Sequence, residues 1–136
     1  MISLKSYSPL LVEHFNHPQN VGCFDETDSA VGTGRAGCVD SGDCVRIQVK
    51  IHQGTIGDIC FKAQGSCATI AVASWVTTKV RHSSAVEVAQ LTPEQILSEL
   101  QLTTIKKHSV LLVLDALNRA CLASHAKIGP HGDSSQ

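Results

Sequence analysis

The sequence lacks the features that mark membrane, secreted and nucleic-acid-binding proteins. No apolar run approaches the roughly 20 residues that a membrane-spanning helix needs, and residues 1–10 carry no apolar signal-peptide segment. Basic residues number 11 and acidic residues 12, so the net charge of −1 gives no reason to expect nucleic acid or an anionic membrane as a partner. We therefore expect a cytoplasmic protein.

Cysteine pairs of the C-x-x-C type are also missing, although the chain has six cysteines. Their absence excludes the usual zinc-ribbon arrangement. In a reducing compartment, lone cysteines are metal ligands, reactive thiols or small buried apolar residues rather than disulfide partners. A G-x-G-x-x-G string occupies residues 32–37, but it neither follows a convincing strand nor opens a helix. It therefore does not indicate a dinucleotide site.

The periodicity of apolar residues predicts a small sheet followed by helices. Apolar and polar residues alternate over 45–51, Gln53-Gly54 is typical of a turn, and 56–63 reads as the returning strand of a hairpin. The preceding segment 19–42 is rich in turn-forming residues and allows at most an edge strand around 30–36. The helical segments are predicted at 9–17, 68–82, 85–90, 93–100 and from 108 onward.

With 136 residues, 43% of them apolar, the chain has the material for one modest core. We predict a single α+β domain over 1–128, in which helices cover a small antiparallel sheet of about three strands. Residues 129–136 are predicted to form a disordered tail.

Polar or sulfur-bearing residues gather where three of these elements begin. Asp43 precedes the best strand, where it is either a turn residue or a ligand. Ser66-Cys67 precedes the first long helix, where the helix dipole lowers the pKa of a nearby thiol; the alternative is a Ser66 cap with Cys67 buried.

The third point lies before the last helix, at 106–109 (Lys-Lys-His-Ser). Cations at a helix N-terminus oppose the helix dipole, so they are either kept to bind an anion or a metal-bound sulfide, or simply solvated.

These three points occur in a wider pattern that resembles a known family. Tyr7-Ser8-Pro9 and residues 14–22 (His-Phe-Asn-His-Pro-Gln-Asn-Val-Gly) resemble the opening of the iron–sulfur cluster scaffold family, the IscU proteins and the N-terminal domain of NifU. Gly42-Asp43, Phe61-Lys62 with Gly65, and residues 105–108 continue the resemblance in order and spacing. It extends over about residues 7–125.

The resemblance implies a carrier rather than an enzyme. Family members hold a nascent [2Fe–2S] cluster, or zinc, with three cysteines plus an Asp or His, and Asp43 and His108 match those two residues. Lys106 matches the lysine of the family's chaperone-binding segment. The implied partners are a cysteine desulfurase, an Hsp70-type chaperone system and acceptor apoproteins.

This chain departs from the family at the ligands themselves. All three positions expected to be cysteine are serine, namely Ser41, Ser66 and Ser109. A hydroxyl is a poor replacement for a thiolate toward iron or zinc, so either the replacement is deliberate or the chain is a paralogue that has lost the site. The segment 102–106 also lacks the prolines of the family's Leu-Pro-Pro-Val-Lys, which weakens the expectation of chaperone binding.

The sequence leaves three functions open. The first is a scaffold that holds or transfers a [2Fe–2S] cluster or its iron at a site weakened by the serines, with Cys38, Cys44 or Cys67 as replacement thiols. The second is a pseudo-scaffold without a cluster that binds and regulates an assembly partner such as the desulfurase. The third is a zinc-binding domain that uses Asp43, His108 and Cys67.

Overall fold

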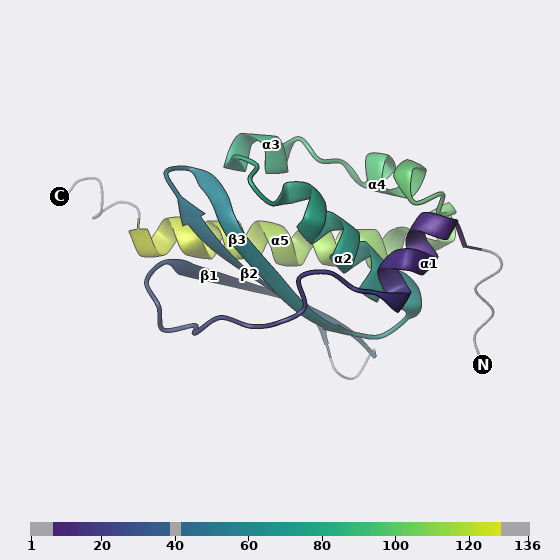
Figure 1. Ribbon diagram of the computed structural model, residues 1–136, viewed down its shortest axis with the longest axis horizontal. Coiled ribbons are helices and arrows are strands. Elements are labelled where there is room, and N and C mark those ends of the chain that lie inside the picture. Colours follow the sequence, from purple (N-terminus) through teal and green to yellow (C-terminus); the bar gives the residue numbers. More distant parts are fainter. Residues whose placement is uncertain (1–6, 39–41, 129–136) are drawn as a thin grey trace.

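The computed structural model describes residues 7–38 and 42–128. Three strands follow the first helix, and the remaining helices come after the sheet (Figure 1). The elements in chain order are α1 (Pro9–Asn16), β1 (Val31–Cys38), β2 (Asp43–His52), β3 (Thr55–Gln64), α2 (Cys67–Val80), α3 (Ala85–Ala89), α4 (Pro93–Glu99), the 3₁₀ turn η2 (Thr104–Lys106) and α5 (Lys107–Ile128). The predicted α+β class and all five helices are confirmed.

The sheet is an antiparallel meander in the order β1-β2-β3. Gln53 and Gly54 have φ of 53° and 78°, the left-handed values that a tight hairpin turn requires, which confirms the turn between β2 and β3. The edge strand expected around 30–36 is confirmed as β1, which lies at the edge of the sheet and extends to Cys38. Its glycines hide the alternating pattern by which a strand is normally found.

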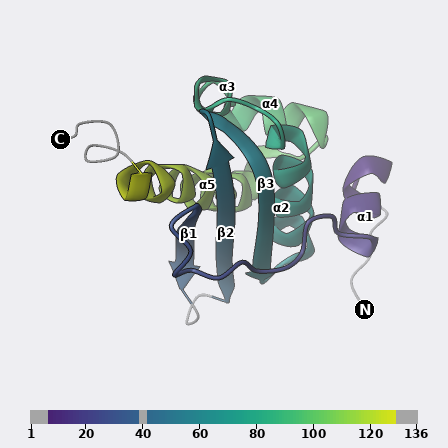
Figure 2. The same ribbon diagram turned by 60° about the vertical axis from the view of Figure 1, so that its left-hand side comes forward.

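One face of the sheet is covered by two long helices (Figures 1 and 2). α5 packs against β1 and β2, and α2 packs against β3. The alternate residues Val45, Ile47 and Val49 of β2 point into this layer and are fully or almost fully buried. Within the described part of the chain, no helix is both long enough and apolar enough to span a membrane.

The glycines of β1 set how closely α5 approaches the sheet. A Cβ placed on Gly34 would lie 2.1 Å from the carbonyl oxygen of Ala116, and one on Gly32 would lie 2.2 Å from that of Ala120. Only hydrogen fits at these positions. The first two glycines of the G-x-G-x-x-G string are therefore explained by helix–strand packing, whereas the third, Gly37, has a φ of +86° and lies against the main chain of Asp43. Both findings agree with the rejection of the string as a dinucleotide motif.

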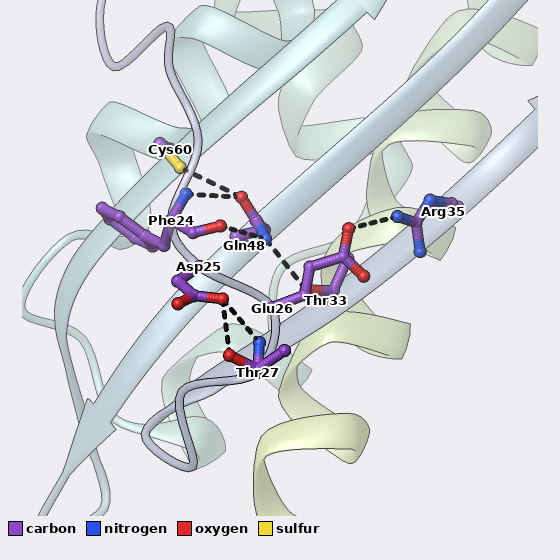
Figure 3. Close-up of polar contacts among 8 residues, drawn as sticks. All are labelled: Phe24, Asp25, Glu26, Thr27, Thr33, Arg35, Gln48 and Cys60. Carbon is purple, nitrogen blue, oxygen red and sulfur yellow. Dashed lines mark hydrogen bonds and ion pairs between the residues drawn. The ribbon is translucent and has the colours of Figure 1, made fainter.

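The segment between α1 and β1 crosses the other face of the sheet (Figure 2). Gln48 of β2 holds it there, because its side-chain amide accepts a hydrogen bond from the backbone N–H of Phe24 at 2.8 Å and donates one to the carbonyl of Phe24 at 3.0 Å (Figure 3). The same amide also donates to Thr33 Oγ1. Gln48 is only 1% exposed, and these contacts account for a polar side chain buried on the sheet.

Candidate functional site

The side chain of Asp43 connects the beginning of β2 to the beginning of α2. Its Oδ1 accepts a hydrogen bond from the backbone N–H of Ser66 at 3.1 Å and lies 3.3 Å from Thr69 Oγ1. A carboxylate is favoured there because the first N–H groups of a helix have no partner within the helix. Asp43 is thus more than a turn residue.

Gly65 makes this approach possible. Its φ is +133°, and a Cβ on it would lie only 1.9 Å from Asp43 Oδ1. Both the backbone conformation and the space exclude a side chain. Gly65 therefore both forms the turn before the helix and leaves space for the carboxylate of Asp43.

Ser66 is the N-cap of α2. Its Oγ accepts a hydrogen bond from the backbone N–H of Thr69 at 3.3 Å. Cys67, the first residue of the helix, is only 4% exposed. The structure bears out the alternative in which Ser66 caps the helix and Cys67 is buried.

Thr69 is the centre of the site, although it was not among the predicted site residues. It is fully buried, and its Oγ1 lies 3.1 Å from Ser66 Oγ and 2.9 Å from Ser109 Oγ. The single hydroxyl proton of Thr69 is donated to one acceptor at a time, and its oxygen lone pairs can accept hydrogen bonds from the serine hydroxyls. Through Thr69, the beginnings of β2, α2 and α5 share one network of Asp43, Ser66, Thr69 and Ser109.

Two signals in the sequence were available for Thr69. It stands three residues after the capping serine, where a side chain returns to the cap, and it is a polar residue among the apolar residues of a buried helix.

His108 adjoins this network in sequence but is exposed to solvent. The neighbouring lysines have partners within the chain. Lys107 Nζ lies 3.2 Å from Glu94 Oε2, and Lys106 Nζ lies 5.9 Å from the centroid of the Tyr7 ring. Their presence at the beginning of α5 is therefore explained without an anion or a bound sulfide.

The donor set does not suit a soft metal. Among residues 7–38 and 42–128, no three or more His, Cys, Asp or Glu side chains come together in a way that could hold a metal ion. The described residues therefore do not bring Asp43, His108 and Cys67 together, and zinc binding by these three stays a prediction. Ser66 and Ser109 each hydrogen-bond Thr69, and a protonated hydroxyl is a much weaker ligand than a thiolate for the iron of a cluster. Ser41 lies outside the described residues.

The cysteines proposed as replacements do not join the site. Cys44 follows Asp43 on β2, so its side chain belongs to the opposite face of the sheet, and Cys67 is buried. For Cys38 the structure describes only the main chain. Elsewhere, burial raises the pKa of both Cys60 and Cys121 to about 11, which keeps these thiols protonated at neutral pH.

The sequence matches a family model over most of its length. The model is that of the NifU-like N terminal domain, and it matches residues 6–129. Among curated proteins, the chain is 37% identical to the iron–sulfur cluster assembly scaffold protein IscU of Haemophilus influenzae, over 91% of this chain and 99% of that protein. It is 36% identical to the protein of the same name from Escherichia coli, over 85% of this chain and 91% of that protein.

Solved structures share the fold. A nitrogen-fixing NifU-like protein (N-terminal) from Brucella abortus superposes with a TM-score of 0.69 at 17% identity, over 88% of this chain and 94% of that one. An iron–sulfur cluster assembly scaffold protein for the SUF system from Fervidobacterium islandicum, described as putative, gives a TM-score of 0.66 at 14% identity, over 88% and 98% of the two chains. At these identities the likeness concerns the fold alone.

Proposed function

Because the chain belongs to the family of the NifU-like N-terminal domain, which includes the IscU scaffold proteins, we propose that it is a scaffold-type protein of iron–sulfur cluster assembly. The cargo would be a [2Fe–2S] cluster or its iron, held at a site weakened by serine at positions 41, 66 and 109. In this role the protein is a carrier rather than an enzyme. A cytoplasmic location, where thiols stay reduced, belongs to the same proposal.

One observation carries the proposal. Residues at the positions of the family's ligands, Asp43, Ser66 and Ser109, meet around Thr69 where three elements begin. The fold thus assembles the frame of a ligand site from distant parts of the chain. Its hydroxyls are weak ligands for iron, which supports loose rather than stable retention of the cargo.

The partner proposals rest on the region before α5. Ile105 in the turn η2 is 84% exposed, beside Lys106. An apolar side chain held in solvent next to a cation supports binding of a partner segment there, such as one from an Hsp70-type chaperone. The cysteine desulfurase and the acceptor apoproteins are proposed from the role of the family alone.

A second candidate function is that of a pseudo-scaffold without a cluster, which binds and regulates the desulfurase. The observation in its favour is that Ser66 and Ser109 both hydrogen-bond Thr69. A site closed in this way needs no cargo to satisfy its polar groups.

Anaerobic reconstitution with iron and sulfide tests both candidates. We expect little charge-transfer absorption, and iron and sulfide well below one cluster per chain, since three thiolates are missing. Two further assays separate the candidates: a pull-down that measures desulfurase binding, and an assay of cluster transfer to an apoprotein. Transient cluster transfer supports the scaffold, and desulfurase binding without transfer supports the pseudo-scaffold. A stable stoichiometric cluster would contradict the weakened site, and the absence of both transfer and binding would contradict both candidates.

A further inference from the structure

Three cations stand side by side across the strands on the face of the sheet that the helices leave open. The strand register places Arg35 of β1 opposite Arg46 of β2, and Arg46 opposite Lys62 of β3. Directly opposed residues of antiparallel strands share one face, and like charges in these positions repel each other. A row of three cations therefore costs the sheet stability unless something negative lies against it.

Among residues 7–38 and 42–128, an ion-pair partner is found for one of the three cations. Arg35 forms an ion pair with Glu26 (Figure 3). Within the described ranges, Arg46 and Lys62 form no ion pair, and the Nε and Nη2 atoms of Arg46 are buried without a hydrogen-bond acceptor. Buried guanidinium donors without a partner are rare in folded proteins, because each leaves its desolvation uncompensated.

A cavity of about 650 Å³ opens over this row. All three cations line it, and none of the other described residues that line it, which include Gly37, Cys44 and Gln64, carries a negative charge. Its volume lies within the range of small-molecule sites. The segment 22–30 covers the neighbouring row of the sheet, where Gln48 holds Phe24, and it contributes no lining residue to the cavity.

We propose that this cavity binds a small phosphate-bearing anion. The planar fork of Arg46 presents two donors to phosphate oxygens, and Lys62 adds a second charge from the next strand. Arg35, already paired with Glu26, stands at the side of the site. Because Arg46 and Asp43 belong to opposite faces of β2, this site is separate from the serine network and does not depend on the proposed function.

The binding test uses the full-length chain and isothermal titration at constant ionic strength. Pyrophosphate is the main probe, with inorganic phosphate and ADP as further arms. We expect saturable binding of pyrophosphate. ADP bound more tightly than pyrophosphate would identify a phosphorylated organic molecule as the ligand, and equal affinities would identify phosphate groups alone; either result supports the site.

Two variants and a matched control locate the site. Arg46→Gln should weaken pyrophosphate binding by about tenfold or more, since hydrogen bonds to a charged group are lost. Lys62→Gln, at an exposed position that should not affect folding, should weaken it several-fold. Lys79→Gln makes the same charge change on the exposed surface of α2 and should leave binding unchanged.

The proposal is overturned if pyrophosphate does not bind saturably, or if Arg46→Gln and Lys62→Gln bind it as the parent does. An equal loss in Lys79→Gln would show a mere effect of net charge and would also overturn it. Binding of poly-glutamate in the absence of pyrophosphate binding would replace the small anion by an acidic polypeptide.

Discussion

Thr69 Oγ1 lies 2.9 Å from Ser109 Oγ, and this contact joins the first turn of α2 to the first turn of α5 across 40 residues of sequence. Both side chains are buried, and the same threonine hydroxyl also contacts the Asp43 carboxylate and the Ser66 cap. At the place where the family resemblance implies thiolate ligands, this chain has a hydrogen-bonded polar cluster. The cluster therefore bears on stability as well as on metal binding.

Replacing Thr69 with valine should lower the free energy of unfolding by about 1–3 kcal/mol, because Ser109 loses its partner in a buried position. Urea unfolding followed by circular dichroism measures the change. Thr69→Ser keeps the hydroxyl and should recover most of the loss. If Thr69→Val is as stable as the parent, the hydroxyl of Thr69 does not contribute to stability through this network.

The contact between β1 and α5 gives a second prediction. Gly34→Ala should destabilise the protein by about 3 kcal/mol, because its Cβ would meet the main chain of Ala116 and Ala120. Gly57→Ala is the matched control, since its Cβ would lie 3.6 Å from the nearest atom and should change stability by about 0.5 kcal/mol or less. Thermal unfolding compares the two; equal melting temperatures would contradict the packing role of Gly34.

Restoring thiolates should restore metal binding. Combined replacement of Ser41, Ser66 and Ser109 by cysteine should raise zinc affinity by orders of magnitude, since thiolates with an adjacent carboxylate form a suitable ligand set. Competition with a chromophoric chelator measures the affinity. An affinity equal to that of the parent would show that these positions do not surround one site.

Cys67→Ser in that background is the matched control. Cys67 is buried at the first position of α2, about 100° around the helix from its neighbour at 66, so zinc affinity should not change. A large loss of zinc affinity in this variant would assign the thiol to the site after all.

His14 should make stability depend on pH. Its Nδ1 lies 2.7 Å from Ser74 Oγ, and burial lowers its pKa below the usual 6.5 despite the opposing effect of Glu13. His14 therefore binds a proton more readily in the unfolded chain than in the folded chain. The free energy of unfolding is unaffected by this difference above pH 6.5 and decreases as the pH falls below it.

The test compares the free energies of unfolding at pH 7.5 and pH 5.5. The parent should lose more stability between these values than His14→Gln does, whereas His52→Gln, at an exposed position of β2, should behave as the parent. An identical pH dependence in His14→Gln and the parent would contradict the role of His14.

Much of the fold was predictable because its signals are local. The alternation over 45–51, the turn at Gln53-Gly54 and the two capping boxes at Ser84 and Thr92 each act within a few residues, and the structure has all of them. The role of the glycines in β1 was not predictable in this way. They allow close contact with α5, which follows some 80 residues later, and no local pattern indicates that contact.

The site was predictable by position but not by its connections. The family pattern pointed to Asp43, Ser66 and Ser109, and the structure brings these three together. The family pattern does not show that Thr69 connects them, since Thr69 is distant in sequence from Asp43 and Ser109. Whether Cys67 is buried depends on which face of α2 packs against the rest of the protein, and the local sequence does not determine that.

Gln48 has a consequence for how the protein opens. Its side-chain amide accepts from the N–H of Phe24 and donates to the carbonyl of Phe24. These are the two hydrogen bonds that the main chain of a neighbouring strand would otherwise make. The main chain at Phe24, near the beginning of the segment 22–30, is thus held by a side chain that does not belong to the ladder of the sheet. Loss of these two hydrogen bonds should free the main chain at Phe24 while β1, β2 and β3 stay paired, a local opening that amide hydrogen exchange at Phe24 would report apart from global unfolding.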